Sequence, residues 1–509
     1  MDFTNLLGKF FKEIRQDTYA LSVCPAFFVF FGLYLFAHLA IFDNGANLFF
    51  TFGTALFFPF WLLVFTSRIH YKSERSVAIL LLLILFFCLV FEFYSIENTF
   101  ATKNETYVLH DELATLKSVQ KWGRGEAIVF EEQGQKGRKF VLYRWDKAKG
   151  AGKLYILGAT YSVSGFCHPF VARTKNEQKK QKRRYFDQWK FWQGRGVSSC
   201  LTSSKEPQII APPVGLFAIR QLLQEKINSL LLPKSKNYME IFLLGERGKK
   251  VEELYKRSGV LHVMAISGLH VGLLIALLCF LFKDKFLRFF GGTFLLWSYV
   301  FLAGCPVSAL RSAIMAQVLL FSHSLDLPRS SFNSVCIAGS LILLANPFCV
   351  IDVGFTLSFV CVLFLSALPE KLLRGVSSLC IVSALIWIVT SPILAHYFGI
   401  VSLTGILSNI FILPVFGVVF SLTVLLCFAL LFFSFLQFLS PLLEAILSSF
   451  EAYVGMFAKL PAVNVCQTDF LTLVASLIFF AVLYYKMTDN KVKSAVLAAI
   501  FSLAILLLH

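Results

Sequence analysis

Long apolar stretches recur in this chain on both sides of a charged central segment. They lie at residues 24–41, 48–65 and 77–93, and a further series begins at residues 261–282 and continues almost to His509. About 20 apolar residues wound as a helix cross the hydrocarbon core of a bilayer. With 57% hydrophobic and only 15% charged residues, the chain is predicted to be a polytopic α-helical membrane protein of about 10 to 12 spans.

Four parts are predicted: three membrane helices in residues 1–95, an inserted domain in 96–212, interfacial helices in 213–260 and a membrane bundle in 261–509. Helical apolar spacing at residues 216–232 and 251–256 indicates the interfacial helices. Three prolines interrupt the later apolar tracts and predict half-helices, at Pro414, Pro441 and Pro461.

Cations lie before the first apolar stretch, at Lys9, Lys12 and Arg15, and after the second, at Arg68, Lys72 and Arg75. The loop between the two stretches, residues 43–47, has none. Lys and Arg concentrate in short loops on the cytoplasmic side of membrane proteins. The amino terminus is therefore expected in the cytoplasm, and the inserted domain is expected on the outer side of the cytoplasmic (inner) membrane.

Short runs at residues 126–130, 139–143 and 153–157 predict strands of a small barrel or sandwich in the inserted domain. Cations alternate there with aromatic side chains such as Phe140, Tyr143, Trp145 and Tyr155. Barrels that bind single-stranded nucleic acid combine charge and ring stacking in this way. The candidate binding cations are Lys136, Arg138, Lys139, Arg144 and Lys153. A solvated basic surface over an ordinary aromatic core explains the pattern equally well.

A run of cations, KNEQKKQKRR at residues 175–184, follows the predicted strands. Its candidate binding residues are Lys179, Lys180, Lys182, Arg183 and Arg184. The run suits either nucleic-acid phosphates or anionic lipid, as the net charge of +17 also does. Trp189, Phe191 and Trp192 beside it fit interfacial anchors or base-stacking groups.

Cys167 and Cys200 are the only cysteines between Cys88 and Cys279, and both fall in the predicted outer domain. Disulfides persist outside the cytoplasm. The two residues are therefore predicted to be joined, with a stabilisation of about 3 to 4 kcal/mol.

The segment HVMAISGLHVGLL, residues 262–274, carries polar and small residues within an apolar stretch. Wound as one helix, it gathers its polar residues on an arc that faces a watery space, namely His262, Ser267 and His270. Its small residues gather opposite and predict close packing of a second helix, namely Ala265, Gly268, Gly272 and Ala276. Histidine hydrogen bonds to a neighbouring helix explain the polar arc as well. Two histidines eight apart do not chelate from one helix face, so no metal is expected.

The segment LLGERGKKVEELYKRSGVLHVMAISGLHVGLL, residues 243–274, resembles the signature of the ComEC family of competence DNA channels. Three further blocks agree in order and spacing: ALRSAIMA at 309–316, NPFCVIDVGFTLSF at 346–359 and HYFGIVSLTGILSNIFILP at 396–414. The resemblance spans residues 222–431. Upstream, FDQWKFWQGRGV at 186–197 resembles the end of that family's outer oligonucleotide-binding-fold domain.

The resemblance implies an inner-membrane channel that carries one strand of incoming DNA into the cytoplasm during natural transformation. The residues expected to line it are His262, Ser267, His270, Arg311, Asp352, Ser358 and Asn409. Ionised groups in apolar surroundings face a cavity or pair with one another, so Arg311 and Asp352 either line the route or form a structural pair. Asn409, near Pro414, fits either lining or a hydrogen bond within the bundle.

Many members of that family end in a metallo-β-lactamase-like domain with an HxHxDH motif, which this sequence lacks. The Gly-rich segments at Gly150 and Gly245 lack the P-loop arrangement that holds nucleotide phosphates. We therefore expect no catalytic residue and no cofactor, and no enzyme activity. The expected partners are one DNA strand, membrane lipid, an extracytoplasmic DNA receptor, a cytoplasmic motor or strand-binding protein, and a separate nuclease.

Two other classes of protein fit the same composition. One is a transporter or exporter of a small anionic or lipid substrate, whose basic domain rests on head groups. The other is a non-transporting membrane scaffold, whose polar residues only hold helices together.

Overall fold

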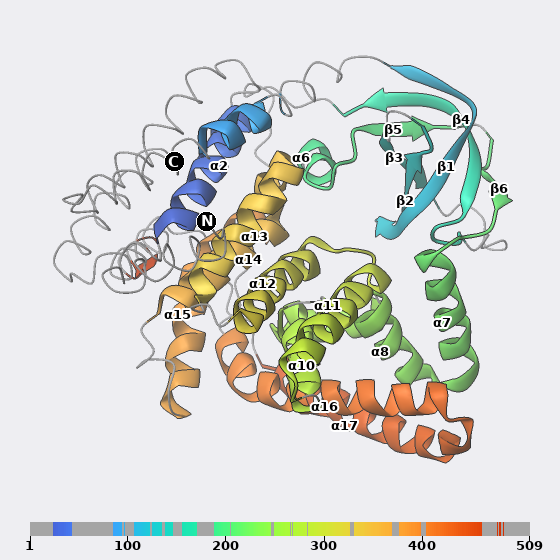
Figure 1. The fold of residues 1–509 in the computed structure, drawn as a ribbon. Helices are drawn as coiled ribbons and strands as arrows, with labels where there is room; N and C mark the ends of the chain where they lie inside the picture. Colours follow the sequence, from blue (N-terminus) through green and yellow to red (C-terminus); the bar gives the residue numbers. More distant parts are fainter. Residues whose placement is uncertain are drawn as a thin grey trace, which may run out of the picture.

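The computed structural model describes residues 24–42, 85–93, 106–122, 125–134, 138–145, 155–170, 188–203, 205–245, 249–264, 268–281, 283–325, 330–368, 376–398 and 404–460, with a few single positions beside them. Figure 1 shows a small β-barrel attached to a bundle of helices. The predicted span at residues 48–65 lies outside these ranges.

Five strands close into the barrel. The strands are β1 (Tyr107–Trp122), β2 (Gly125–Glu132), β3 (Lys139–Arg144), β4 (Thr160–Pro169) and β5 (Ser199–Thr202), with β6 (Gln208–Ala211) added beside β4. Their order is β1-β2-β3-β5-β4, and pairing of β1 with β4 completes the ring. β3 and β5 run parallel, whereas the other pairs are antiparallel. The predicted small barrel is confirmed, and its assignment as an oligonucleotide-binding fold stays a prediction.

Two of the three predicted strands are correct, because residues 126–130 and 139–143 fall within β2 and β3. The third is wrong in its described part. Tyr155 and Ile156 form no strand; the Ile156 N–H donates to the Tyr161 hydroxyl at 2.9 Å, and the Tyr155 ring packs on Tyr161. Strand β1 was not predicted, because charged residues interrupt its alternation and a bulge shifts its register after Leu116.

Four helices connect the barrel to the bundle: α6 (Gln188–Gln193), α7 (Leu216–Leu230), α8 (Pro233–Leu244) and α9 (Lys249–Arg257). The helices predicted at residues 216–232 and 251–256 are confirmed as α7 and α9. Helix α8 was not predicted. It begins with Pro233 in its first turn, where the missing N–H costs nothing, and ends at Gly245 in the left-handed conformation.

The bundle contains α2 (Cys24–Phe42), α10 (Gly268–Leu281), α11 (Lys285–Leu302), α12 (Val307–Ser324), α13 (Ser331–Ala345), α14 (Val353–Ala367), α15 (Val376–Phe398), α16 (Thr404–Phe432) and α17 (Ser440–Ala458). Short 3-10 helices lie at η2 (Leu261–Val263), η3 (Pro347–Ile351) and η5 (Ser434–Leu439). Within the described ranges, two helices are long and apolar enough to cross a membrane, over Ser378–Ala395 and Thr404–Phe432. The predicted total of spans stays a prediction.

The half-helices predicted from prolines are wrong where the structure describes them. Helix α16 continues through Pro414, and Pro441 lies in the first turn of α17. Pro461 lies outside the described residues. A proline inside an apolar helix is tolerated because neighbouring helices satisfy the freed backbone groups. Close to Pro414, the Tyr453 hydroxyl of α17 donates to the carbonyl of Phe411 at 3.2 Å.

Helix α16 exposes an apolar stripe along its length, formed by Leu407, Phe411, Val415, Val418, Leu422 and Leu425. Its opposite face is buried and includes Ile412, Phe416 and Phe420. An exposed stripe of this kind suits lipid rather than water.

Helix α12 lies between two apolar cores. The first core packs α2, α13, η3 and α14 against the base of the barrel, and the second packs α8, α10, α16 and α17 together. Val307 and Met315 of α12 contact the first core, whereas Ala309 and Ala313 belong to the second. Figure 1 shows α12 between α13 on one side and α10 and α11 on the other. We call this boundary the α12 seam.

Candidate functional site

The histidine segment does not form one continuous helix. His262 lies in η2, and α10 begins only at Gly268. The Ser308 hydroxyl of α12 donates to the Ile266 carbonyl at 2.6 Å, so this carbonyl is bound between the two helical pieces by a side chain of another helix. The prediction that these polar residues share one arc of a single helix is therefore wrong. Ser267 and Ala265 lie outside the described residues.

The two histidines have opposite environments. His262 is exposed, whereas His270 is completely buried. Three aromatic rings surround His270, with centroid distances of 5.7 Å to Phe242, 5.5 Å to Phe416 and 4.5 Å to Phe420. The prediction that His270 borders water is wrong for this conformation, because the second core closes around the imidazole.

The predicted packing stripe on α10 is correct only at its start. A Cβ added at Gly268 would lie 3.3 Å from the Ser312 hydroxyl of α12, so these helices do approach closely. Gly272 and Ala276 are exposed, and nothing lies within 4 Å of a Cβ added at Gly272. Helix α10 turns this side away from α12 after its first turn.

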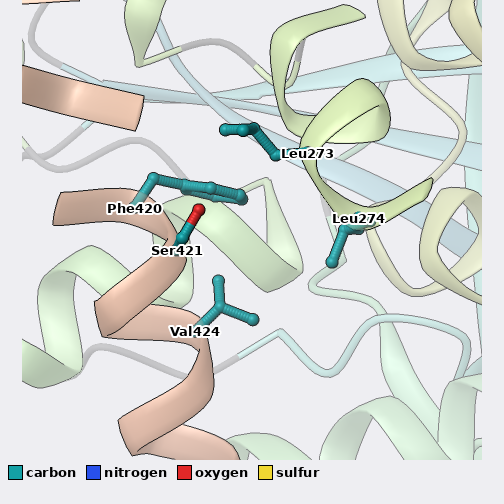
Figure 2. A pocket seen from close by; sticks show the side chains of 5 residues that line it. All are labelled: Leu273, Leu274, Phe420, Ser421 and Val424. Atoms are coloured by element: carbon teal, nitrogen blue, oxygen red, sulfur yellow. The ribbon is translucent and has the colours of Figure 1, made fainter. Parts of the chain in front are cut away.

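A small cavity of ≈ 30 Å³ lies between α10 and α16. Figure 2 shows its lining, with Leu273 and Leu274 from α10 facing Phe420, Ser421 and Val424 from α16. A space of this size holds about one water molecule. Phe420 contributes both to this cavity and to the rings around His270.

Arg311 is a buried cation on the α12 seam. Only 4% of the residue is exposed, and its guanidinium carbon lies 5.4 Å from the centroid of the Phe359 ring of α14. Among the described residues, its Nε and Nη1 have no hydrogen-bond partner and its side chain has no ion pair. A cation–π contact compensates desolvation only in part. Arg311 is therefore suited to bind an anion that reaches this seam.

Asp352 makes contacts that were not predicted. Its carboxylate accepts the Phe355 N–H at 3.1 Å and caps α14, and it pairs with Arg195 of the barrel at 3.2 Å. Its ion-pair partner is therefore Arg195 and not Arg311, and lining of a passage by Asp352 stays a prediction. The second alternative considered for these two ionised residues is wrong, because the partner of Asp352 comes from the barrel.

The Arg195–Asp352 pair belongs to a packed joint between barrel and bundle. The Asn346 amide donates to the Gly194 carbonyl at 3.3 Å, and the Trp189 ring meets Phe348 edge-on. Trp189 and Trp192 are buried, so the predictions of interfacial anchors and of base-stacking groups are both wrong for them. Arg195 was not predicted. Its one signal in the sequence is its position in FWQGRGV, directly after this aromatic cluster.

The two remaining lining candidates are half-buried. Ser358 lies beside Phe359 on α14, and Asn409 lies on α16. The Asn409 Oδ1 is buried without a hydrogen-bond partner in the described structure, as is the hydroxyl of its neighbour Ser408. Both candidates stay predictions.

Several barrel cations are paired with acids. Glu131 binds Lys117 at 2.6 Å and Lys139 at 3.7 Å, and Glu206 binds Arg144 at 3.5 Å. Arg138 lies over the Tyr107 ring at 4.5 Å. The other candidate cations lie outside the described residues, namely Lys136, Lys153, Lys179, Lys180, Lys182, Arg183 and Arg184.

Most of the aromatic residues predicted to stack on bases already contact other residues of the protein. Phe140 is buried in the barrel core, and the Tyr143 hydroxyl accepts a hydrogen bond from Trp192 Nε1 at 2.6 Å. Burial raises the pKa of Tyr143 to about 12. Trp145 is exposed, and one side of its ring stacks on Tyr143 with the centroids 6.4 Å apart.

The predicted disulfide is wrong, because Cys167 and Cys200 are both free. In the β4–β5 register, Cys167 faces Leu201 and Cys200 faces His168. Adjacent residues of a strand point to opposite faces, so the two thiols lie on opposite sides of the sheet. Burial raises the pKa of Cys167 to about 11, so its thiol stays protonated at neutral pH. Across the described ranges, no three His, Cys, Asp or Glu side chains form a group able to hold a metal.

Taken together, the described residues form an apolar helical bundle, two of whose helices are long and apolar enough to cross a membrane, with a small β-barrel attached. Residues 242–489 match the family described as Competence protein. These residues form a competence-protein domain of the ComEC family, and the predicted family is confirmed.

Three relatives illustrate the likeness. ComE operon protein 3 of Bacillus subtilis (strain 168) is 29% identical over 209 residues, covering 39% of this chain and 27% of the relative. The protein MG316 of Mycoplasma genitalium is 30% identical over 186 residues, covering 35% and 48%. A protein of Aquifex aeolicus is 30% identical over 220 residues, covering 40% and 52%. The chain thus spans between about a quarter and a half of these relatives' lengths. No solved structure shows a significant match to the chain.

Proposed function

We propose that this chain passes one strand of DNA through the cytoplasmic membrane during natural transformation, along the α12 seam. The competence-protein domain and the likeness to ComE operon protein 3 support DNA uptake as the process. One observation carries the proposed route: the buried guanidinium of Arg311 has no acidic partner in the described part of the chain.

A buried cation without a counter-ion is destabilised by several kcal/mol, according to the cost of desolvating an ion. A phosphodiester supplies both the missing charge and the acceptor oxygens, and arginine matches phosphate with two parallel N–H···O bonds. Arg311 therefore gains interactions when a strand enters the seam. A cation at this position would lower the free-energy barrier that a polyanion meets at the most apolar part of its route.

We propose that passage requires movement around α10, because the described residues there pack closely. The cavity of ≈ 30 Å³ beside α10 is far smaller than a nucleotide, and the His270 ring is enclosed. We propose that the two apolar cores separate along α12, which would expose Arg311 while leaving each core packed. Ser358 and Asn409 are proposed as further polar contacts on this route, and His262 as an exposed group near its entrance.

The proposed orientation places the amino terminus in the cytoplasm and the barrel outside. An incoming strand would then meet the barrel first, delivered by an extracytoplasmic DNA receptor. A cytoplasmic motor or strand-binding protein would supply the driving force, and a separate nuclease would remove the second strand.

The test compares variants in a strain that lacks the wild-type protein. Arg311→Gln should reduce cytoplasmic arrival of labelled DNA by about tenfold or more, since a charge-assisted hydrogen bond contributes about 1.5–3 kcal/mol. Arg311→Lys should restore part of the arrival, because the charge remains while the bidentate geometry is lost. Surface binding of DNA, scored separately, should not change.

Lys285→Gln provides the control, because Lys285 is an exposed cation at the start of α11. Protein abundance in the membrane is measured for every strain. Wild-type arrival of DNA with Arg311→Gln at normal abundance would exclude the proposed route.

A second function is favoured by the pairing of Lys139 with Glu131 and of Arg144 with Glu206, which leaves this part of the barrel with less charge for a polyanion. That function is transport of a small anionic or lipid substrate. Cytoplasmic arrival of DNA that is unaffected by deletion of the gene would favour it.

A further inference from the structure

A strip of exposed aliphatic residues joins the barrel to the bundle. It runs from β6 into the first half of α7, and its members are Ile210, Val214, Leu216, Ile219 and Leu222. All five are between 48% and 75% exposed. We call this surface the β6–α7 strip. An exposed apolar patch of this kind marks a contact with a membrane or a partner.

The fold fixes the outward direction of this strip. Leu216, Ile219 and Leu222 are three residues apart, so they share an arc of about 120° on one helix face. Another face of α7 buries Arg220, whose guanidinium donates to the Leu244 carbonyl of α8 at 2.7 Å and to the Leu302 carbonyl of α11. Helix α7 therefore cannot rotate the strip inward without breaking these bonds.

The composition of the strip favours lipid over nucleic acid. Residues 207–219 contain no charged side chain, and the five members of the strip carry no aromatic ring on which a base could stack. Lys205 and Lys226 flank the strip, at the positions where cations extend toward head groups. Helix α7 also contacts α16, which is long and apolar enough to cross a membrane.

We propose that the β6–α7 strip inserts into the bilayer at the boundary between head groups and acyl chains, so that the barrel rests on the membrane by this edge. Figure 1 shows that α6 and α7 leave the barrel on different sides. The barrel is then held at two places, by the strip on lipid and by the Arg195–Asp352 joint on the bundle. This inference concerns lipid and does not depend on the passage of DNA.

The experiment places a photo-crosslinking amino acid in the full-length protein in native membranes. It replaces Ile210 or Leu222 of the strip, and in a matched variant it replaces Val108, an exposed apolar residue on β1 outside the strip. Phe294, exposed on α11 within the bundle, serves as the positive control for lipid. Each substituted residue is exposed, so folding should be preserved. Adducts are identified by mass spectrometry.

Lipid adducts are expected from the probe at Ile210 and at Leu222. No lipid adduct is expected from the probe at Val108. Absence of lipid adducts from Ile210 while Phe294 forms them would overturn the proposal. So would cross-links from Ile210 to a second copy of the chain or to an added oligonucleotide. Equal lipid adducts at Val108 and Ile210 would also overturn it, because the strip would then not be a distinct contact.

Discussion

At the scale of single residues, the buried polar groups differ in what satisfies them. Arg220 binds backbone carbonyls at the carboxyl ends of α8 and α11, which are the negative ends of the helix dipoles. Asp352 binds both a helix amino terminus and a cation. Arg311 has an aromatic ring but no acid among the described residues. The first two residues stabilise the fold, whereas the third is the residue on which the proposed route depends.

Replacement of Arg220 by Met should destabilise the protein by about 2–4 kcal/mol, because two buried carbonyls would lose their donor. The change in unfolding free energy can be measured by urea titration of the purified protein in detergent. Lys226→Met, on an exposed position of the same helix, should change it by less than about 0.5 kcal/mol. Equal effects of the two substitutions would contradict the role of Arg220.

The cysteines give a second prediction at this scale. Protein unfolded without reductant should react with maleimide at both Cys167 and Cys200, because the two thiols lie on opposite faces of the sheet. Mass spectrometry of the labelled peptides provides the measurement. Recovery of a linked peptide containing both cysteines would show that the register of β4 and β5 is wrong.

At the scale of elements, helix α8 begins on a side chain from a distant part of the chain. The Glu444 carboxylate of α17 accepts hydrogen bonds from the N–H groups of Lys234 and Ser235, at 3.1 Å and 3.0 Å, and from the Ser235 hydroxyl at 2.7 Å. A carboxylate is favoured at the amino terminus of a helix, where it meets N–H groups without intrahelical partners. Helix α8 therefore depends on α17 for its start.

Stability should depend on pH through Glu444. Burial alone would raise the pKa of Glu444, but the hydrogen bonds from Ser235 and Lys234 outweigh burial and lower it. A lowered pKa in the folded state means that the carboxylate stabilises the protein above the ordinary glutamate pKa of about 4.3. That contribution is lost as the pH falls through the folded-state value.

The expected result is a higher Tm for the wild type than for Glu444→Gln at pH 7, with a difference that shrinks below a pH of about 4.3. The difference in Tm is measured by thermal unfolding of both proteins at a series of pH values from 7 to below about 4.3. Glu253→Gln is the control, because Glu253 pairs with Arg257 on the exposed side of α9. A constant difference at all pH values would exclude titration of Glu444 as the cause.

At the scale of the whole molecule, the barrel contributes to the first of the two apolar cores of the bundle. Ala127 and Val141 of the barrel and Trp192 of α6 pack into the same cluster as Phe332 and Phe355 of the bundle. Polar bonds around Gly194 and Asp352 surround this contact. The joint should therefore fix the barrel relative to α14, the helix that carries Phe359 against Arg311.

A double-mutant cycle tests the joint. Arg195→Gln and Asp352→Asn should show a coupling of about 0.5–3 kcal/mol in the free energy of unfolding, as expected for residues in direct contact. Asparagine is also a good helix cap, so Asp352→Asn removes the charge while keeping the start of α14. A coupling close to zero would mean that the ion pair does not hold the two parts together.

The amino-acid sequence by itself determined the membrane class, the small barrel, the amphipathic helices α7 and α9, and the family. These features depend on hydrophobic length, on alternation and on local motifs, which are properties of neighbouring residues. The same kind of reasoning singled out Arg311 as a cation that faces a cavity or a partner, because an ionised group within an apolar helix avoids lipid.

Only the tertiary structure decided how distant residues meet. It paired Asp352 with Arg195 rather than Arg311, separated Cys167 from Cys200, and enclosed His270 in three aromatic rings. It also carried α16 unbroken through Pro414. Each outcome depends on strand register or on packing between helices, and neither is encoded in the spacing of residues along one segment. The physical reason is that long-range contacts are chosen by the shape and burial of the whole core, to which every element contributes.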